Sequence, residues 1–423
     1  MGIRRSGSCK WVCSIVSVGF MLSVPVVAVG DGPATPAEIL RSTYPSAVVL
    51  RPSAAREIGE RLTHALSQCR DSHLACRLHY RQGVIYFKAG MMQDAETVFE
   101  ALVTLSESPD LVRVCSLNMI GQIARLQGDN TAALGRFERL AELCEALVAK
   151  HPDDASLGAY RRLWRAALIG QAEIHEFHRD YAAGAAAYER LLNAGEHFED
   201  ARWLAHDGPF VLDRLSRLYL QMGNTAKYLE LTASLAALHP AYERMPAVAL
   251  ERMCVDLLQH TGERFDVSGG AFQAPAHVVA CLRRNPTAPW VPGALNAVEA
   301  LCRKYRAAPD GALLDYHHAW MLDAAGRYDE AIQAAARVAS IGDTEAVAEA
   351  QGAGPSYINE LRKYAAVQQA IMLTEKAGYR EALQRLASLL LDAEAEPHLS
   401  QLVESMTHCI QTLKREVSSH DIR

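Results

Sequence analysis

The chain has 423 residues, half of them hydrophobic, which is enough for two or three ordinary domains or for one long repeat array. Its formal net charge is −6 and it has no basic run. Because nucleic-acid binding depends on neutralising phosphates, this composition argues against a nucleic-acid-binding protein. Arginine outnumbers lysine and alanine is abundant, which hints at a bacterial source with a GC-rich genome.

Residues 1–30 are predicted to be a secretory signal peptide. A basic start, MGIRRSGSCK, precedes the uncharged run WVCSIVSVGFMLSVPVVAVG, whose small-residue end suits a signal peptidase. We expect cleavage after Gly30 and export to the periplasm or the medium, which would leave 40 Lys and Arg against 49 Asp and Glu, a net charge of −9. The alternative is an anchor retained as a membrane helix, because the run approaches the roughly 20 residues that span a bilayer.

Nearly every segment after Pro52 has helical periodicity, and no run alternates as a half-buried strand does, so the fold is predicted to be all-α. The segment LHYRQGVIYFKAGMMQDAETVFEAL, from Leu78, is repeated 38 residues later by LNMIGQIARLQGDNTAALGRFERL. The matching positions include Gly83 and Gly121, Gly90 and Gly128, Ala95 and Ala133, and Phe99 and Phe137. Each unit is predicted to be two amphipathic helices around a tight turn, with small residues where the helices cross and a glycine that ends the first helix.

This pattern resembles the tetratricopeptide repeat, in which small residues, aromatics, glycine and alanine follow one another in that order across a helix pair. AGRYDEAIQAAARVA, from Ala325, is similar to the start of the second helix of such a unit. Further units of decreasing similarity begin near Leu168, Leu212, Ala319 and Gln368. The resemblance covers about two thirds of the mature chain, with spacings longer than the family's usual ~34 residues. It implies an irregular α-solenoid.

The repeat pattern and its breaks predict how the chain is organised. Between Pro240 and Gly311 the pattern is lost among the breakers HTGERFDVSGGAFQAP and RRNPTAPWVP, which we interpret as a degenerate joint between two repeat blocks. The predicted parts are a signal peptide (1–30), an extended leader (31–52), an N-terminal repeat block (53–245), the helical joint (246–310), a C-terminal repeat block with a capping helix (311–417) and a tail (418–423).

The resemblance also implies a binding surface, because the outward positions of each first helix line a concave groove in the family. Mapped onto this sequence, those positions are Arg77, Tyr80, Phe87, Lys88, Asn118, Gln122, Arg125, Glu173, Glu176, Asp213, Arg217, Tyr316, Trp320 and Asp323. This mixture of aromatic and charged residues suits an extended peptide. The alternative is an ordinary solvated helix face.

Eight cysteines remain after the predicted cleavage, and in an oxidising compartment they could pair. Their positions around predicted turns favour the disulfides Cys69–Cys76, Cys115–Cys144 and Cys254–Cys281. The alternatives are free thiols that pack as small hydrophobic residues and, less favoured, a metal site formed by Cys69, His73, Cys76 and His79.

No catalytic or cofactor-binding motif is present. The sequence has no GxSxG, no HExxH and no phosphate-binding glycine loop. His317 and His318 point about 100° apart on a helix without a nucleophile beside them, so both are predicted to be structural. The acidic stretch GEHFEDARWLAHDGPF is interpreted as a solvated loop before a helix.

We therefore expect a non-catalytic scaffold in the bacterial cell envelope, without metal or cofactor, that binds proteins or peptides and touches a membrane only through an uncleaved N-terminal segment. One alternative is a secreted helical-repeat enzyme acting on a polysaccharide or peptide, with Glu173, Glu199 or Asp207 as its acid. Another is a structural envelope component held by that uncleaved segment.

Overall fold

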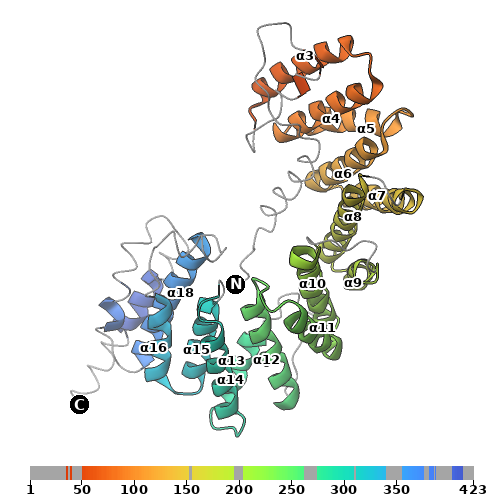
Figure 1. The fold of residues 1–423 in the computed structure, drawn as a ribbon. Coiled ribbons are helices and arrows are strands. Elements are labelled where there is room, and N and C mark those ends of the chain that lie inside the picture. The colour runs from red at the N-terminus through yellow and green to blue at the C-terminus, as the bar shows by residue number, and fades with distance from the viewer. Residues whose placement is uncertain are drawn as a thin grey trace, which may run out of the picture. The chain divides into compact units, whose positions relative to one another are not determined.

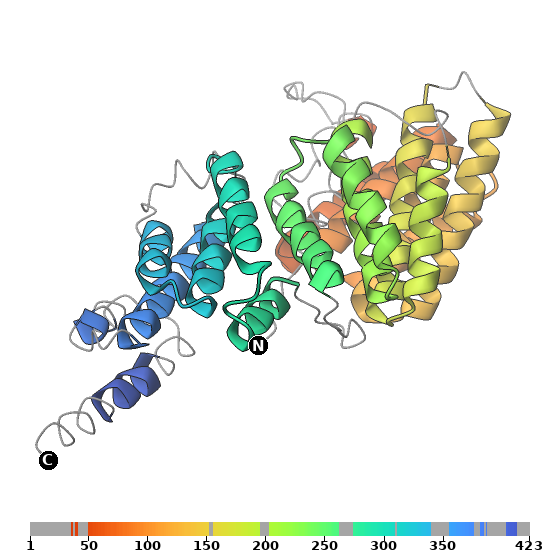
Figure 2. The same ribbon diagram turned by 90° about the horizontal axis from the view of Figure 1, so that it is seen from below.

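The computed structural model describes residues 35–36, 39–40, 50–151, 155–194, 203–261, 274–308, 311–339, 355–375, 381–384, 386 and 403–412. In these ranges all regular structure is helical and no residue forms a strand (Figure 1, Figure 2). The predicted all-α solenoid class is confirmed. The predicted signal peptide lies outside the described residues. Among the described helices, none combines the length and apolar character that crossing a bilayer requires.

The chain packs as two compact units, Met1–Leu218 and Tyr219–Arg423. Unit 1 contains α3 (Pro52–Gln68), α4 (Ser72–Lys88), α5 (Met92–Thr104), α6 (Asp110–Gln127), α7 (Asn130–Lys150), α8 (Leu157–Phe177), α9 (Tyr181–Leu192), a π-helical turn (Trp203–Asp207) and most of α10 (Gly208–Gln221). From α3 to α9, each helix contacts the next one along the chain. The first helices of neighbouring pairs, α4 with α6 and α6 with α8, also contact each other.

The predicted crossings of the first two units are present. A Cβ atom on Gly83 would lie 2.7 Å from the ring of Phe99, and one on Gly121 would lie 2.7 Å from the ring of Phe137. Real Cβ atoms do not approach that closely, so each first helix can lie against its partner only because the position is glycine. The rings of Phe99 and Phe137 are completely buried.

The turn between α6 and α7 shows how a repeat reverses direction within two residues. Gly128 has φ +84°, and its N–H donates to the carbonyl of Arg125, while the N–H of Asp129 donates to the carbonyl of Ala124. This pair of bonds ends α6 as a glycine C-cap does. The Asp129 carboxylate then accepts from the N–H of Ala132 and begins α7.

Unit 2 contains α11 (Thr225–Leu238), α12 (Met245–Thr261), α13 (Ala274–Arg284), α14 (Val291–Lys304), α15 (Gly311–Ala324), α16 (Tyr328–Ala339) and α18 (Pro355–Glu375). The predicted joint corresponds to α12, α13 and α14. In α16, Ala331, Ala334 and Ala335 are fully buried, and α16 contacts both α15 and α18. Helices on two sides of α16 explain why its buried face uses so little side-chain volume.

The boundaries predicted at 245/246 and 310/311 mark where the repeat pattern changes, whereas packing divides the chain at Leu218. The predicted boundaries describe the repeat pattern of the sequence, and the division at Leu218 describes the packing of the chain. The predicted block boundaries stay predictions.

Candidate functional site

The candidate surface of unit 1 runs across the first helices α4, α6, α8 and α10. An ion pair between Arg125 Nη1 and Glu173 Oε2, 2.5 Å apart, joins α6 to α8. On α8, one turn further along, Glu176 is paired with Arg214 of α10. The Tyr188 hydroxyl of α9 donates to the same Glu176 carboxylate over 3.0 Å. The fold thus brings Arg125, Glu173 and Glu176, all predicted from the sequence, into one row of charged groups.

The negative charge of the buried Glu176 carboxylate is stabilised by its arginine partner. Burial raises the pKa of Glu176 above its ordinary value, while the charge of Arg214 and the Tyr188 hydrogen bond lower it. The pKa of Arg214 is raised by the facing Glu176 charge against the opposing effect of burial. The two charges therefore hold each other in a setting that water reaches poorly.

Substituting Arg214→Met is expected to destabilise the protein by about 1–3 kcal/mol at pH 7, because Glu176 then remains as a largely buried, poorly paired carboxylate. Without Arg214 the pKa of Glu176 rises further. A carboxyl whose pKa is higher in the folded state than in the unfolded state gives stability at low pH that is lost as the pH rises. The loss caused by Arg214→Met should therefore be smaller near pH 4 than at pH 7, as measured by chemical denaturation at both values.

The matched control is Arg139→Met on the exposed side of α7, where we expect a change within about 0.5 kcal/mol at either pH. Equal destabilisation by Arg214→Met at pH 4 and pH 7 would contradict the role given to Glu176.

Five predicted groove positions are buried rather than outward, which corrects that part of the prediction. Their side chains are at most 5% exposed: Tyr80, Asn118, Gln122, Asp213 and Asp323. The ring of Tyr80 lies 5.5 Å from that of Phe99, inside the helix pair. Asn118 and Gln122 are buried because α6 is contacted by α4, α5, α7 and α8, which leaves the middle of this helix no solvated face.

The remaining nine predicted positions are half-buried: Arg77, Phe87, Lys88, Arg125, Glu173, Glu176 and Arg217 in unit 1, and Tyr316 and Trp320 in unit 2. These residues stay candidates for contact with a partner.

In unit 2 the candidate surface centres on Trp320 of α15. The ring of Tyr316, one turn earlier, stands nearly perpendicular to it with the ring centroids 6.5 Å apart. The guanidinium carbon of Arg283 lies 5.6 Å from the Trp320 ring centroid, and Arg283 Nη2 donates to Asp323 Oδ2 over 3.2 Å. The sequence identified three of these four residues. It missed Arg283, which comes from the joint helix α13 and has no repeat position.

All eight described cysteines are free thiols, and the three predicted disulfides are not formed in this structure. The Cys69 thiol donates to the carbonyl of Asp71 over 3.3 Å. Burial raises the pKa of Cys115 to about 12, which keeps that thiol neutral. Pairing in an oxidising compartment stays a prediction.

The acids proposed for an enzyme are engaged by arginines where the structure describes them. Glu173 is paired with Arg125, and Asp207 Oδ2 lies 3.2 Å from Nε of the buried Arg165. Glu199 lies outside the described residues. Two of the three acids named for the enzyme alternative are therefore paired with arginines.

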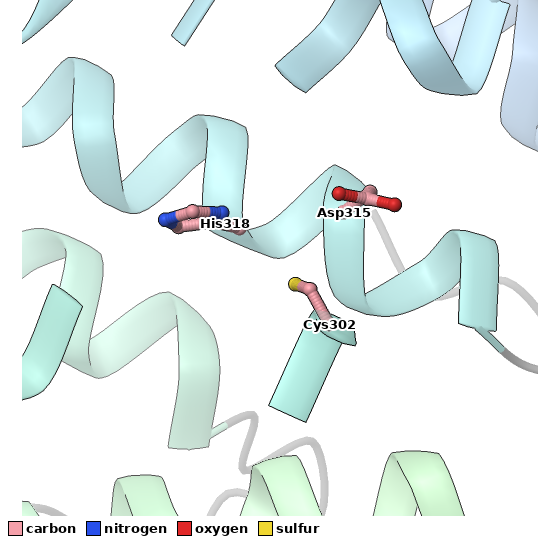
Figure 3. A group of neighbouring side chains, drawn as sticks. All are labelled: Cys302, Asp315 and His318. Carbon is pink, nitrogen blue, oxygen red and sulfur yellow. The ribbon is translucent and has the colours of Figure 1, made fainter. Parts of the chain in front are cut away.

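The structure groups three metal-ligating side chains that the sequence analysis did not connect. Cys302, Asp315 and His318 each present one ligand atom, and these atoms all lie within 4.8 Å of one another (Figure 3). In the described residues this is the one such group of three, and the earlier candidates around Cys69 and His73 do not form one. The available signal was the spacing of Asp315 and His318, which puts both on one helix face.

Residues 78–106, which cover α4 from Leu78 onward and all of α5, match the tetratricopeptide repeat family. Similar solved structures include the C-terminal part of a TPR repeat-containing protein from Cytophaga hutchinsonii, with 11% identity, a TM-score of 0.41, and coverage of 74% of this chain and 97% of that one. A tetratricopeptide repeat protein from Parabacteroides merdae is 14% identical, with a TM-score of 0.38 and coverage of 78% of this chain and 98% of that one. Yeast Tom70 is 11% identical, with a TM-score of 0.29 and coverage of 96% of this chain and 93% of that one. No curated protein matches the chain.

Proposed function

Because this chain carries a tetratricopeptide repeat, at residues 78–106 of an all-α solenoid, we propose that it is a non-catalytic scaffold that binds protein or peptide partners. The observation that carries the proposal is the row of charged side chains across α6, α8 and α10 in unit 1. Arg125, Glu173 and Glu176 are held there by ion pairs between neighbouring helices. Side chains that are already ordered lose little conformational entropy when a partner binds.

The chemistry of α4 indicates the kind of segment that would bind at that end of the row. Arg77 and Lys88 are half-buried and lie within about 20° of each other around the helix axis. Phe87, also half-buried, lies about 80–100° around the helix axis from these two residues. Two cations on one side of the helix, about 16 Å apart along its axis, suit an extended segment with acidic side chains.

We further propose that the protein acts in the bacterial cell envelope. The support is the layout of residues 1–30, a basic start followed by an apolar run and a small-residue end. Fractionation together with N-terminal sequencing of the isolated protein tests this. A mature chain that begins after Gly30 in the periplasm or medium supports export, and a cytoplasmic protein that retains Met1 contradicts it.

Site-specific photocrosslinking tests the proposed surface. A photoreactive residue at position 77 or 88 should capture a protein partner in the cells that make this protein, because both positions lie on the proposed face of α4. The matched control is position 101, which is exposed on α5, the second helix of the same repeat. We expect no capture from position 101. Equal capture from α4 and α5, or no captured protein from either, would contradict binding through the first-helix face.

A further inference from the structure

Cys302, Asp315 and His318 meet where the predicted joint packs against the C-terminal repeat block. Cys302 lies in the last turn of α14, and Asp315 and His318 lie three residues apart on one face of α15. The Cys302 sulfur points toward α15, between the other two side chains (Figure 3). A thiol, a carboxylate and an imidazole from two packed helices are thus within reach of one another.

One atom of this group lacks a hydrogen-bond partner. His318 is 6% exposed, and its Nδ1 atom is fully buried without a partner among the described residues. Buried polar atoms are nearly always paired, so an unpaired one calls for a specific explanation such as an absent ion. An imidazole binds a metal ion through an unprotonated ring nitrogen.

The surroundings of the group are mixed in charge. Arg337 of α16 donates a hydrogen bond to Asp315 Oδ1 over 2.9 Å. The charges of Arg327 and Glu299 also interact electrostatically with His318. Cys302 is 6% exposed and Asp315 is half-buried, so water reaches the group mainly from the Asp315 side. Arg337 is the kind of outer partner that orients a carboxylate ligand.

We propose that Cys302, Asp315 and His318 bind one Zn²⁺ ion that joins α14 to α15. Thiolate, imidazole and carboxylate are all ligands of zinc, and three protein ligands leave one of four tetrahedral positions for water. On binding, the Cys302 S–H bond breaks, its proton leaves to solvent and an S–Zn bond forms. Metal–ligand bonds of about 2.0–2.3 Å set the ligand atoms roughly 3.5 Å apart. Atoms now as much as 4.8 Å apart reach that spacing by small side-chain rotations.

The choice of zinc rests on the donor set. Magnesium and calcium prefer oxygen ligands, whereas a thiolate with an imidazole favours a softer ion. The ion would tie the joint helix to the repeat that carries Tyr316 and Trp320, which gives it a structural role independent of the proposed scaffold function.

The test is a titration of the purified protein, kept reduced and metal-free, with Zn²⁺ in competition with a chromophoric chelator. We expect one tight site per chain. The variants Cys302→Ser and His318→Gln should each weaken that site at least tenfold, whereas His317→Gln, which changes the neighbouring histidine outside the group, should leave it unchanged. Zinc binding that is equal in all four proteins, or no site tighter than micromolar, would overturn the proposal.

A second measurement needs no variant and so does not depend on how the variants fold. Co²⁺ added to the wild-type protein should give a thiolate-to-metal charge-transfer band, and Zn²⁺ should abolish that band at one equivalent. Co²⁺ binding without such a band would show that Cys302 is not a ligand and would overturn the assignment.

Discussion

Replacing Phe137 by alanine is expected to lower the free energy of unfolding by about 3–5 kcal/mol, the cost of emptying a large buried aromatic site. The Phe137 ring is completely buried on α7 and lies between two glycines of different repeats. A Cβ on Gly121 of α6 would be 2.7 Å from it, and one on Gly170 of α8 would be 2.8 Å from it. Neither glycine has a side chain that could fill the cavity, so relaxation should recover little of the loss.

The matched control is Phe177→Ala in the same unit. Phe177 is 77% exposed at the end of α8, and its removal should change the free energy of unfolding by less than about 0.5 kcal/mol. Both changes can be measured by chemical denaturation followed by circular dichroism. A loss below 1 kcal/mol for Phe137→Ala would show that this ring does not join the two repeats.

The helix pairs were predictable because their determinants are local. Gly83 with Phe99, and Gly121 with Phe137, lie within 16 residues of each other and recur at a fixed offset. Gly128 marks the helix end through its own backbone conformation, φ +84°. Such features are visible in a single unit and are repeated in the next one.

The buried groove positions were not predictable in the same way. Helical periodicity separates a core face from an outer face when a helix has neighbours on one side only. Around Asn118 and Gln122, contacts from four other helices cover both faces of α6. The number of helices that pack against α6 cannot be predicted from the sequence of α6 alone. An outward position inferred for one unit therefore holds only where the array leaves that face open.

The Cys302 group was missed for a related reason. Its members come from α14, in the region without a repeat pattern, and from α15, which has one. Considered as part of YHHAWMLD alone, His318 has no ligand partner beside it, and the thiol that completes the group lies 16 residues earlier. Asp315 and His318 share one face of α15, but only the packing of α14 against α15 brings the Cys302 thiol to them.

The buried ion pair between Arg165 and Asp207 should be the most sensitive charged contact in unit 1. The side chain of Arg165 is 2% exposed and that of Asp207 is 22% exposed, with Nε and Oδ2 3.2 Å apart. The guanidinium also lies 5.8 Å from the Trp203 ring centroid. Substituting Asp207→Ala is expected to cost about 2–4 kcal/mol, because it removes the carboxylate that lies 3.2 Å from a nearly fully buried guanidinium. Chemical denaturation measures this loss.

The double variant Arg165→Met/Asp207→Ala tests how much of the loss comes from the buried charge of the guanidinium. Burying a charge is expensive, and an apolar side chain of similar length avoids that cost, so the double variant should be more stable than Asp207→Ala alone. The control is Glu100→Ala, which breaks the half-exposed pair with Arg136 in the same unit and should cost no more than about 1 kcal/mol. A double variant that is no more stable than Asp207→Ala alone would show that the destabilisation does not come from the buried charge of Arg165.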